Sequence, residues 1–217
     1  PVARGGQGTD RMKPDVMVFD IGRVLIGWDP EGFYDRVIGP KARARLFAEV
    51  DLHGMNLRID AGEGFLGPVA EMAARYPHWA DAIMLWHDRW LDLVTGPIPR
   101  SVAMMRALKR AGVPVLALTN FGNETLKIAK ARFDFLNEFD RMFVSAELRL
   151  LKPDPAIYAA LELGTGYAPQ RLFFTDDRPE NCAAAAARGW HTHVFDGPEG
   201  LEKALLAHGL LTEETLP

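Results

Sequence analysis

Five short apolar runs, separated by longer helix-like segments, dominate the sequence of 217 residues. Each run is rich in Val, Phe or Leu and is short enough to be a strand buried on both faces. The predicted strands are Val16–Phe19, Val115–Leu118, Arg141–Val144, Leu172–Phe174 and Thr192–Phe195. Strands that alternate with helices form a parallel sheet covered by those helices, so the sequence predicts an α/β fold.

The segments between these runs carry the start and stop signals of helices. Glycine follows three of them, at Gly112, Gly189 and Gly209, and proline marks two helix entries, at Pro153 and Pro179. The predicted helices are Arg100–Arg110, Asn123–Arg132, Pro155–Leu163, Glu180–Arg188 and Gly200–His208.

Residues 29–96 interrupt this alternation, because no strand is evident there. Trp79, Ile83, Trp86 and Trp90 recur at the three- and four-residue spacing of one apolar helix face. Such a stripe is more typical of core packing than of a cofactor site. We therefore predict a small helical lobe over residues 29–96, inserted into a core formed by residues 1–28 and 97–217.

Composition excludes several classes of protein. Hydrophobic residues make up 48% and charged residues 25%, as in a soluble globular protein with a full apolar core. The net charge of −4 provides no positive excess for nucleic acid, and the single cysteine, Cys182, excludes an intrachain disulfide or a Cys-rich zinc site. No apolar run approaches the roughly 18 residues that span a membrane. Pro1–Lys13 lacks the apolar region of a secretory signal, so we expect a cytoplasmic protein whose natural start is Met12.

Polar residues follow three of the predicted strands where each one ends. Asp20 follows the first strand, Thr119 and Asn120 follow the second, and Asp176 and Asp177 follow the fourth. In an open parallel sheet, ligands bind beyond the carboxyl ends of the strands. The sequence therefore predicts one site at this edge.

The residue types at this edge indicate phosphoryl transfer. Three carboxylates this close need a counter-ion, and a hard cation with oxygen ligands is Mg²⁺. Thr119 adds a hydroxyl group, and Lys152 adds a positive charge just before a helix. Taken singly, Asp20 fits a turn, Asp176 and Asp177 fit a helix cap, and Lys152 fits an exposed loop. Their ordered succession at the ends of elements favours a carboxylate nucleophile with a metal ion.

The sequence resembles the haloacid dehalogenase (HAD) superfamily over nearly the whole chain, from Asp15 to about Leu211. The residues of its first motif are most similar to those of a bacterial branch of sugar-phosphate phosphatases and haloacid-dehalogenase-like hydrolases. The resemblance implies a Rossmann-like core with strand order 5-4-1-2-3 and a helical cap inserted after the first motif. It is carried by four motifs: Asp20-Ile21-Gly22-Arg23-Val24, Thr119-Asn120, Lys152-Pro153 and Asp176-Asp177.

The resemblance also implies roles for the acidic residues. Asp20 would be the nucleophile that takes the phosphoryl group as an aspartyl-phosphate, and Gly22 would offer its backbone carbonyl to Mg²⁺. Asp177, supported by Asp176, would complete the metal site. The sequence leaves open which of these two aspartates is a direct ligand.

The remaining motif residues would contact the substrate, which for a phosphatase is a small phosphomonoester, with a sugar phosphate as one candidate. Thr119 and the Asn120 amide would hold the transferring phosphate, and Lys152 would neutralise charge on the phosphate and on Asp20. Arg23 is unusual at its position, and its guanidinium either binds an anion or pairs with a surface carboxylate. A monomer and a homodimer are both compatible with the sequence.

The first motif departs from most phosphatases of the superfamily, which carry a second aspartate two residues after the nucleophile. That position is Gly22, which has no side chain to act as acid or base. Such help is typically worth about 10²–10⁴-fold. We therefore expect either low activity or help from a bound water or a lobe residue, with Asp29, His53 and Asp60 as candidates.

Gly22 keeps two alternatives open. One is a metal-independent 2-haloacid dehalogenase, in which Asp20 attacks a carbon that bears halide. The other is a catalytically weakened binding module. We favour the phosphatase because Asp176 and Asp177 would repel an anionic substrate unless a metal ion were present.

Overall fold

A computed structural model describes residues 13–217 and contains a five-stranded parallel sheet. From one edge to the other the strands are β5 (Arg141–Val144), β4 (Val115–Thr119), β1 (Val16–Phe19), β6 (Leu172–Asp176) and β7 (His191–Val194). Numbered 1 to 5 along the chain, they lie in the order 3-2-1-4-5, which is the predicted order 5-4-1-2-3 read from the opposite edge. The α/β fold is confirmed. The predicted start at Met12 lies outside the described residues.

The central strand β1 explains why the apolar runs are continuous rather than alternating. Both of its faces are covered, so all four of its residues are buried. Val16 and Val18 belong to one apolar cluster, whereas Met17 and Phe19 belong to a second cluster on the opposite face.

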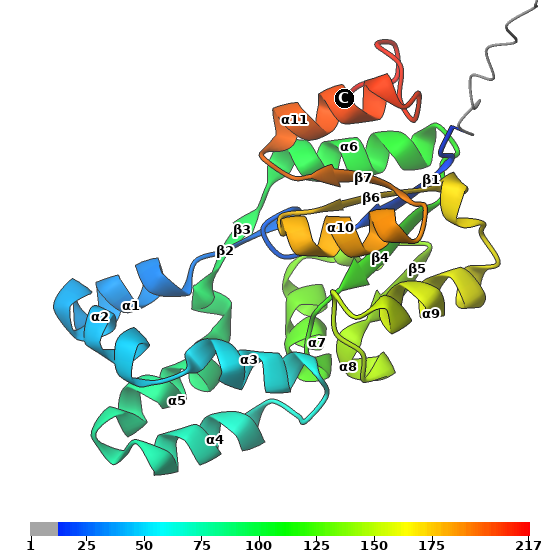
Figure 1. The fold of residues 1–217 in the computed structure, drawn as a ribbon. Coiled ribbons are helices and arrows are strands. Elements are labelled where there is room, and N and C mark those ends of the chain that lie inside the picture. Colours follow the sequence, from blue (N-terminus) through cyan, green and yellow to red (C-terminus); the bar gives the residue numbers. More distant parts are fainter. Residues whose placement is uncertain (1–12) are drawn as a thin grey trace, which may run out of the picture.

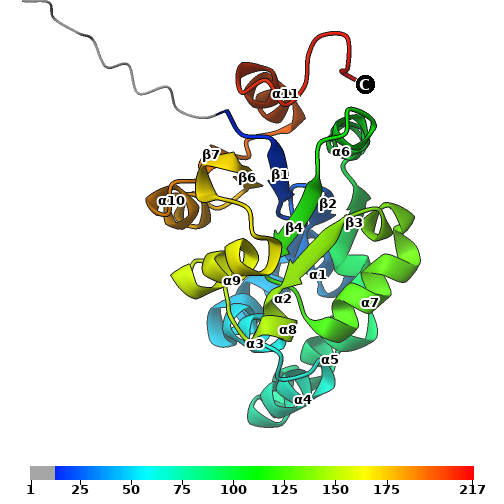
Figure 2. The same ribbon diagram turned by 90° about the vertical axis from the view of Figure 1, so that its right-hand side faces the viewer.

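Helices cover both faces of the sheet (Figures 1 and 2). One face packs against α9 (Pro155–Thr165) and α10 (Pro179–Ala187). The other packs against α6 (Pro99–Arg110), α7 (Asn123–Arg132) and α11 (Pro198–Ala207). Short elements complete the connections: α8 (Ser145–Leu148), η3 (Asp134–Asn137) and η4 (Pro169–Arg171).

Five helices gather beyond one end of the sheet, where Figure 1 shows them in blue to green. They are α1 (Pro30–Ile38), α2 (Pro40–Glu49), α3 (Leu52–Asp60), α4 (Leu66–Arg75) and α5 (Ala80–Asp88). In the described part of the chain, no helix combines the length and apolar character needed to cross a membrane.

The sequence missed a two-stranded antiparallel ribbon that joins these helices to the sheet. It pairs β2 (Ile26–Trp28) with β3 (Val94–Pro97). Each strand is too short to show alternation, and the glycines Gly27 and Gly96 face each other across the pair. The predicted boundary at residue 29 comes directly after β2, whereas the one at residue 96 falls inside β3. The division into core and lobe remains a prediction.

The spacing of the tryptophan stripe predicted one helix, but its residues lie in three successive elements. Trp79 lies in η1 (Pro77–Trp79), Ile83 and Trp86 lie in α5, and Trp90 lies in η2 (Trp90–Leu93). The helix ends because Arg89 leaves helical geometry, with φ −127°. Ile83, Trp86 and Trp90 are nevertheless buried together in the apolar core, as a packing stripe should be.

Candidate active site

Three parallel strands bring the predicted acidic residues to one edge of the sheet. Asp20 follows β1, Asp176 ends β6, and Asp177 comes next in the chain. One carboxylate oxygen from each of the three lies within 4.8 Å of the others. The three acids therefore form a single cluster, although 156 residues separate Asp20 from Asp176.

Lys152 lies inside this cluster and is almost fully buried. Its Nζ contacts Asp20 Oδ1 at 2.8 Å and Asp176 Oδ2 at 2.6 Å, and it donates to the carbonyl of Leu118 at 2.9 Å. Burial lowers the pKa of Lys152, but the attraction of Asp20 and Asp176 outweighs it and holds the pKa above its usual range. The lysine is therefore a fixed positive charge beside Asp20.

The side chain of Asn120 positions Lys152. Its Nδ2 donates to the backbone carbonyl of Lys152 at 3.1 Å, and its Oδ1 accepts from the backbone N–H of Lys152 at 2.8 Å. Both functional groups of the amide are thus used to hold the lysine loop against the end of β4. Thr119, the preceding residue, is fully buried, and its Oγ1 has no hydrogen-bond partner within residues 13–217.

The two neighbouring aspartates have different environments. Asp176 is fully buried and accepts from Lys152 Nζ, from the Arg178 N–H at 2.8 Å and, with both oxygens, from Asn181 Nδ2 at 3.0 Å. Asp177 faces the cavity and has an ion pair with Arg23 at 3.9 Å. Asp176 is thus occupied in orienting Lys152, whereas the carboxylate of Asp177 is accessible to a ligand.

Too much negative charge collects at this edge for one lysine to balance. Burial raises the pKa of Asp20 to about 7, with Lys152 opposing the rise and Asp176 adding to it. Burial and the charge of Asp176 also raise the pKa of Asp177. A cation between Asp20 and Asp177 would remove this conflict.

The donor set fits Mg²⁺ in particular. Asp20 and Asp177 supply carboxylate oxygens, and Gly22 lies on the wall of the same cavity with its backbone carbonyl. Hard divalent cations prefer oxygen ligands, and Mg²⁺ needs only a few from the protein because it keeps several waters.

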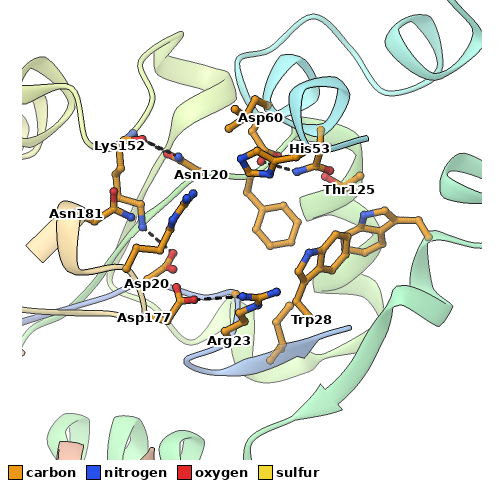
Figure 3. A pocket seen from close by; sticks show the side chains of 17 residues that line it. Asp20, Arg23, Trp28, His53, Asp60, Asn120, Thr125, Lys152, Asp177 and Asn181 are labelled. Carbon is orange, nitrogen blue, oxygen red and sulfur yellow. Dashed lines mark hydrogen bonds and ion pairs between the residues drawn. The ribbon is translucent and has the colours of Figure 1, made fainter. Parts of the chain in front are cut away.

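A cavity of about 310 Å³ opens in front of the cluster, as Figure 3 shows. Of the predicted site residues, it is lined by Asp20, Gly22, Arg23, Asn120, Lys152 and Asp177, whereas Thr119 and Asp176 are fully buried beside it. Figure 3 shows Trp28 across the cavity from Asp20, and Trp90, which also lines the cavity, has its ring centroid 6.0 Å from that of Trp28. The cavity therefore has one charged wall and one aromatic wall.

Arg23 has an unusual backbone at the entrance to this cavity. Its φ is +58°, a left-handed conformation that is uncommon outside glycine, and its N–H donates to the Ile26 carbonyl at 2.7 Å. The turn brings the guanidinium beside Asp177, where it is more than half exposed. Arg23 thus pairs with a carboxylate of the cavity itself, and its predicted role in binding an anion stays a prediction.

The three lobe residues considered as acid or base candidates lie in different places. Asp29 caps α1 by accepting from the Gly32 N–H at 2.9 Å, as a structural aspartate does. His53 and Asp60 both come from α3 and line the cavity (Figure 3). Asn181 also lines it and was missed in the sequence analysis; the signal that could have found it is its place in the first turn of the helix that Pro179 opens, just after Asp176 and Asp177.

The doubly covered parallel sheet and the carboxylate-lined cavity beyond its strand ends define a Rossmann-like enzyme. Its family is established by sequence: the model of the haloacid dehalogenase-like hydrolases matches residues 41–189, more than half of the chain. The chain belongs to this family of hydrolases, which confirms the resemblance. The match includes Lys152 and Asp177, while Asp20 precedes it.

Solved structures confirm the fold. A HAD-like family hydrolase from Porphyromonas gingivalis is 22% identical with a TM-score of 0.71, over 90% of this chain and 98% of that chain. A HAD family enzyme from Bacteroides thetaiotaomicron is 24% identical with a TM-score of 0.65, over 84% and 93%. That enzyme has also been solved in complex with magnesium and inorganic phosphate.

A second kind of chemistry occurs among these neighbours. The L-2-haloacid dehalogenase from Xanthobacter autotrophicus, with chloropropionic acid covalently bound, is 18% identical with a TM-score of 0.57, over 91% of this chain and 84% of that chain. At such identities the likeness establishes the fold, and the reaction must be argued from the site itself.

Proposed function

We propose that this hydrolase is a Mg²⁺-dependent phosphatase that acts on a small phosphomonoester through an aspartyl-phosphate on Asp20. The observation that carries the proposal is the group of three carboxylates within 4.8 Å, of which only Asp20 and Asp177 remain open to the cavity. The complex of the Bacteroides enzyme with magnesium and phosphate supports it.

The same carboxylates disfavour the dehalogenase alternative. A 2-haloacid is an anion, and without a metal ion it would approach Asp20 past the carboxylate of Asp177. Arg23, which lines the cavity together with Lys152 and Arg178, already faces Asp177 at 3.9 Å. A phosphate ester brought in with Mg²⁺ meets no such excess of negative charge.

The predicted site residues would have different tasks in this reaction. When bound, Mg²⁺ supplies positive charge that stabilises the developing charge on the phosphoryl oxygens. Lys152 contacts Asp20 Oδ1 and so fixes the carboxylate that would attack phosphorus. The unpartnered hydroxyl of Thr119 and the backbone amide of Asn120 donate to the transferring phosphate. Asn120 also fixes the lysine loop through its side chain.

Hydrolysis of p-nitrophenyl phosphate is expected to require Mg²⁺. Chelation with EDTA should lower the rate by about 100-fold or more and excess Mg²⁺ should restore it, because the metal stabilises charge in the transition state. Asp177→Asn removes a carboxylate ligand and should raise the Mg²⁺ concentration for half-maximal rate by about tenfold or more. Steady-state rates across a Mg²⁺ titration measure both effects.

Asp92→Asn is the matched control, since Asp92 is half-exposed and pairs with Arg89 on the surface. It should titrate with Mg²⁺ as the wild-type protein does. Release of halide from 2-chloropropionate that is unaffected by EDTA, with no phosphate release from the aryl ester, would instead establish the dehalogenase.

A further inference from the structure

The proposed hydrolysis transfers a proton in each of its two steps, and Gly22 has no side chain that could donate or accept it. A poor leaving group such as an alkoxide oxygen must gain a proton, and the attacking water must lose one. At Gly22 an added Cβ would meet no atom of the described residues within 4 Å, so the space beside the nucleophile is open. The proton carrier therefore has to reach this space from another element.

Asp60 ends α3 and lines the cavity that contains Asp20 (Figure 3). Its carboxylate is held by Asn56, whose Nδ2 donates to Oδ2 at 2.9 Å, and it is near enough to the backbone N–H of Gly122 for that group to lower its pKa. The backbone is anchored to the core as well, since Ser145 Oγ donates to the Asp60 carbonyl at 2.6 Å. The side chain is thus fixed beside the β4 loop that carries Asn120.

A glycine two residues after Asp60 allows the end of α3 to lie close to α8. Gly62 has φ +92°, and an added Cβ there would lie 2.6 Å from the carbonyl oxygen of Ala146. Only glycine lets the backbone come so near to α8 in this conformation. Asn56 is itself held by Trp86, whose Nε1 donates to Asn56 Oδ1 at 3.3 Å.

The protonation of Asp60 suits both halves of the reaction. Burial raises its pKa to about 7, while the Gly122 N–H opposes this rise, Asp20 adds to it and Lys152 opposes it. A carboxyl group with a pKa near neutrality is populated both as acid and as base around pH 7. The same carboxyl group can therefore donate a proton in the first step and accept one in the second.

We propose that Asp60 is the general acid and base of this enzyme, in place of the side chain missing at Gly22; this inference rests on the phosphatase function proposed above. In the first step Asp20 forms a bond to phosphorus, the bond from phosphorus to the leaving oxygen breaks, and Asp60 gives that oxygen its proton. In the second step the Asp60 carboxylate takes a proton from water, the water oxygen bonds to phosphorus, and the bond from phosphorus to Asp20 breaks. Inorganic phosphate leaves and Asp60 is protonated again.

The dependence of the rate on the leaving group tests this role. Benzyl alcohol is a poor leaving group that needs a proton, whereas p-nitrophenolate leaves without one. Asp60→Asn should therefore lower kcat/KM for benzyl phosphate by about 10²–10⁴-fold, and for p-nitrophenyl phosphate by less than about tenfold. With p-nitrophenyl phosphate the variant should also release a burst of one nitrophenolate per enzyme. Without the base, hydrolysis of the aspartyl-phosphate becomes slower than its formation.

Three other variants complete the experiment. Asp51→Asn makes the same chemical change at the exposed start of α3, where asparagine also caps a helix, and it should match the wild-type protein. Gly22→Asp in the Asp60→Asn background should restore part of the benzyl phosphate activity, since the space at residue 22 admits a side chain. His53→Asn should leave the leaving-group dependence unchanged.

The possible failures are distinct. Equal losses for the two esters in Asp60→Asn, or wild-type rates for both while Asp20→Asn is inactive, would overturn the role of Asp60 and leave the phosphatase intact. A leaving-group-dependent loss in His53→Asn instead would assign the proton to His53. Hydrolysis by Asp20→Asn at the wild-type rate would overturn the phosphatase mechanism itself.

Discussion

Asp20→Asn is expected to remove phosphatase activity and, at the same time, to raise the melting temperature of the metal-free protein at pH 8. The amide cannot form an aspartyl-phosphate, so kcat should fall on the order of 10⁴-fold or more. The gain in stability follows from the electrostatics, because burial raises the pKa of Asp20 to about 7. Ionising this carboxyl group therefore costs more free energy in the folded protein than in the unfolded chain.

The pH dependence of that gain gives the sharper measurement. Below about pH 4, Asp20 is protonated in both the folded and the unfolded state, so wild type and variant should melt alike. As the pH rises towards 7, the unfolded chain ionises first, the wild-type protein loses stability, and the difference grows to its full size above about pH 7. Lys152 keeps its contact with Asp176 in the variant. An inactive variant that is less stable than wild type at pH 8 would contradict the assigned electrostatics.

The strands and the acidic edge were predictable because buried parallel strands leave a direct signal in the sequence. The run from Val16 to Phe19 is apolar at every position since both of its faces are covered, and the structure has β1 at those residues. Once the strands are parallel, the residues that follow them share one edge whatever their distance in the chain. The convergence of Asp20 with Asp177 follows from that topology alone.

The roles of individual side chains were less predictable, because they depend on hydrogen bonds between distant elements. Asn120 is recognisable in the sequence only as a residue that follows a strand. No sequence pattern predicts that both the N–H and the carbonyl group of its side chain bind the Lys152 backbone. The difference between Asp176 and Asp177 likewise arises from Asn181, which approaches only after α10 has packed on the sheet.

Asp60 illustrates the same limit for the lobe. In the sequence, Asp29 and Asp60 are two aspartates near helix ends, and either one could be a cap. The antiparallel β2–β3 ribbon and the close approach of Gly62 to Ala146 decide which of them reaches the cavity. Both features rest on short segments with little periodic signal, so the sequence could offer candidates but could not choose between them.

Lys152→Met is expected to destabilise the fold as well as abolish activity. The buried Nζ contacts Asp20 at 2.8 Å and Asp176 at 2.6 Å, and methionine would leave these two carboxylates without their cation. Removing one partner of a buried ion pair costs about 3–5 kcal/mol, which in a chain of this size is roughly 6–20 °C in melting temperature. Activity should fall by about 10²–10³-fold or more, because a charge that stabilises the transition state is lost.

A second substitution separates the electrostatic cause from simple loss of packing. In Lys152→Met with Asp176→Asn, one of the two opposed carboxylates is neutral, and Oδ1 of the new asparagine can still accept from the Arg178 N–H. We therefore expect the double variant to recover most of the lost melting temperature while remaining inactive, as measured by thermal unfolding in parallel with phosphate release.

The control for this pair is Lys109→Met, because Lys109 pairs with Asp140 at the surface and not in the interior. It should change the free energy of unfolding by less than about 1 kcal/mol. The deficit of Lys152→Met should also shrink as the pH falls towards 4, since protonation of Asp20 removes the repulsion that the lysine balanced. A deficit that is independent of pH, and that the Asp176→Asn substitution does not relieve, would mean that Lys152 stabilises the protein through its aliphatic chain and not through its charge.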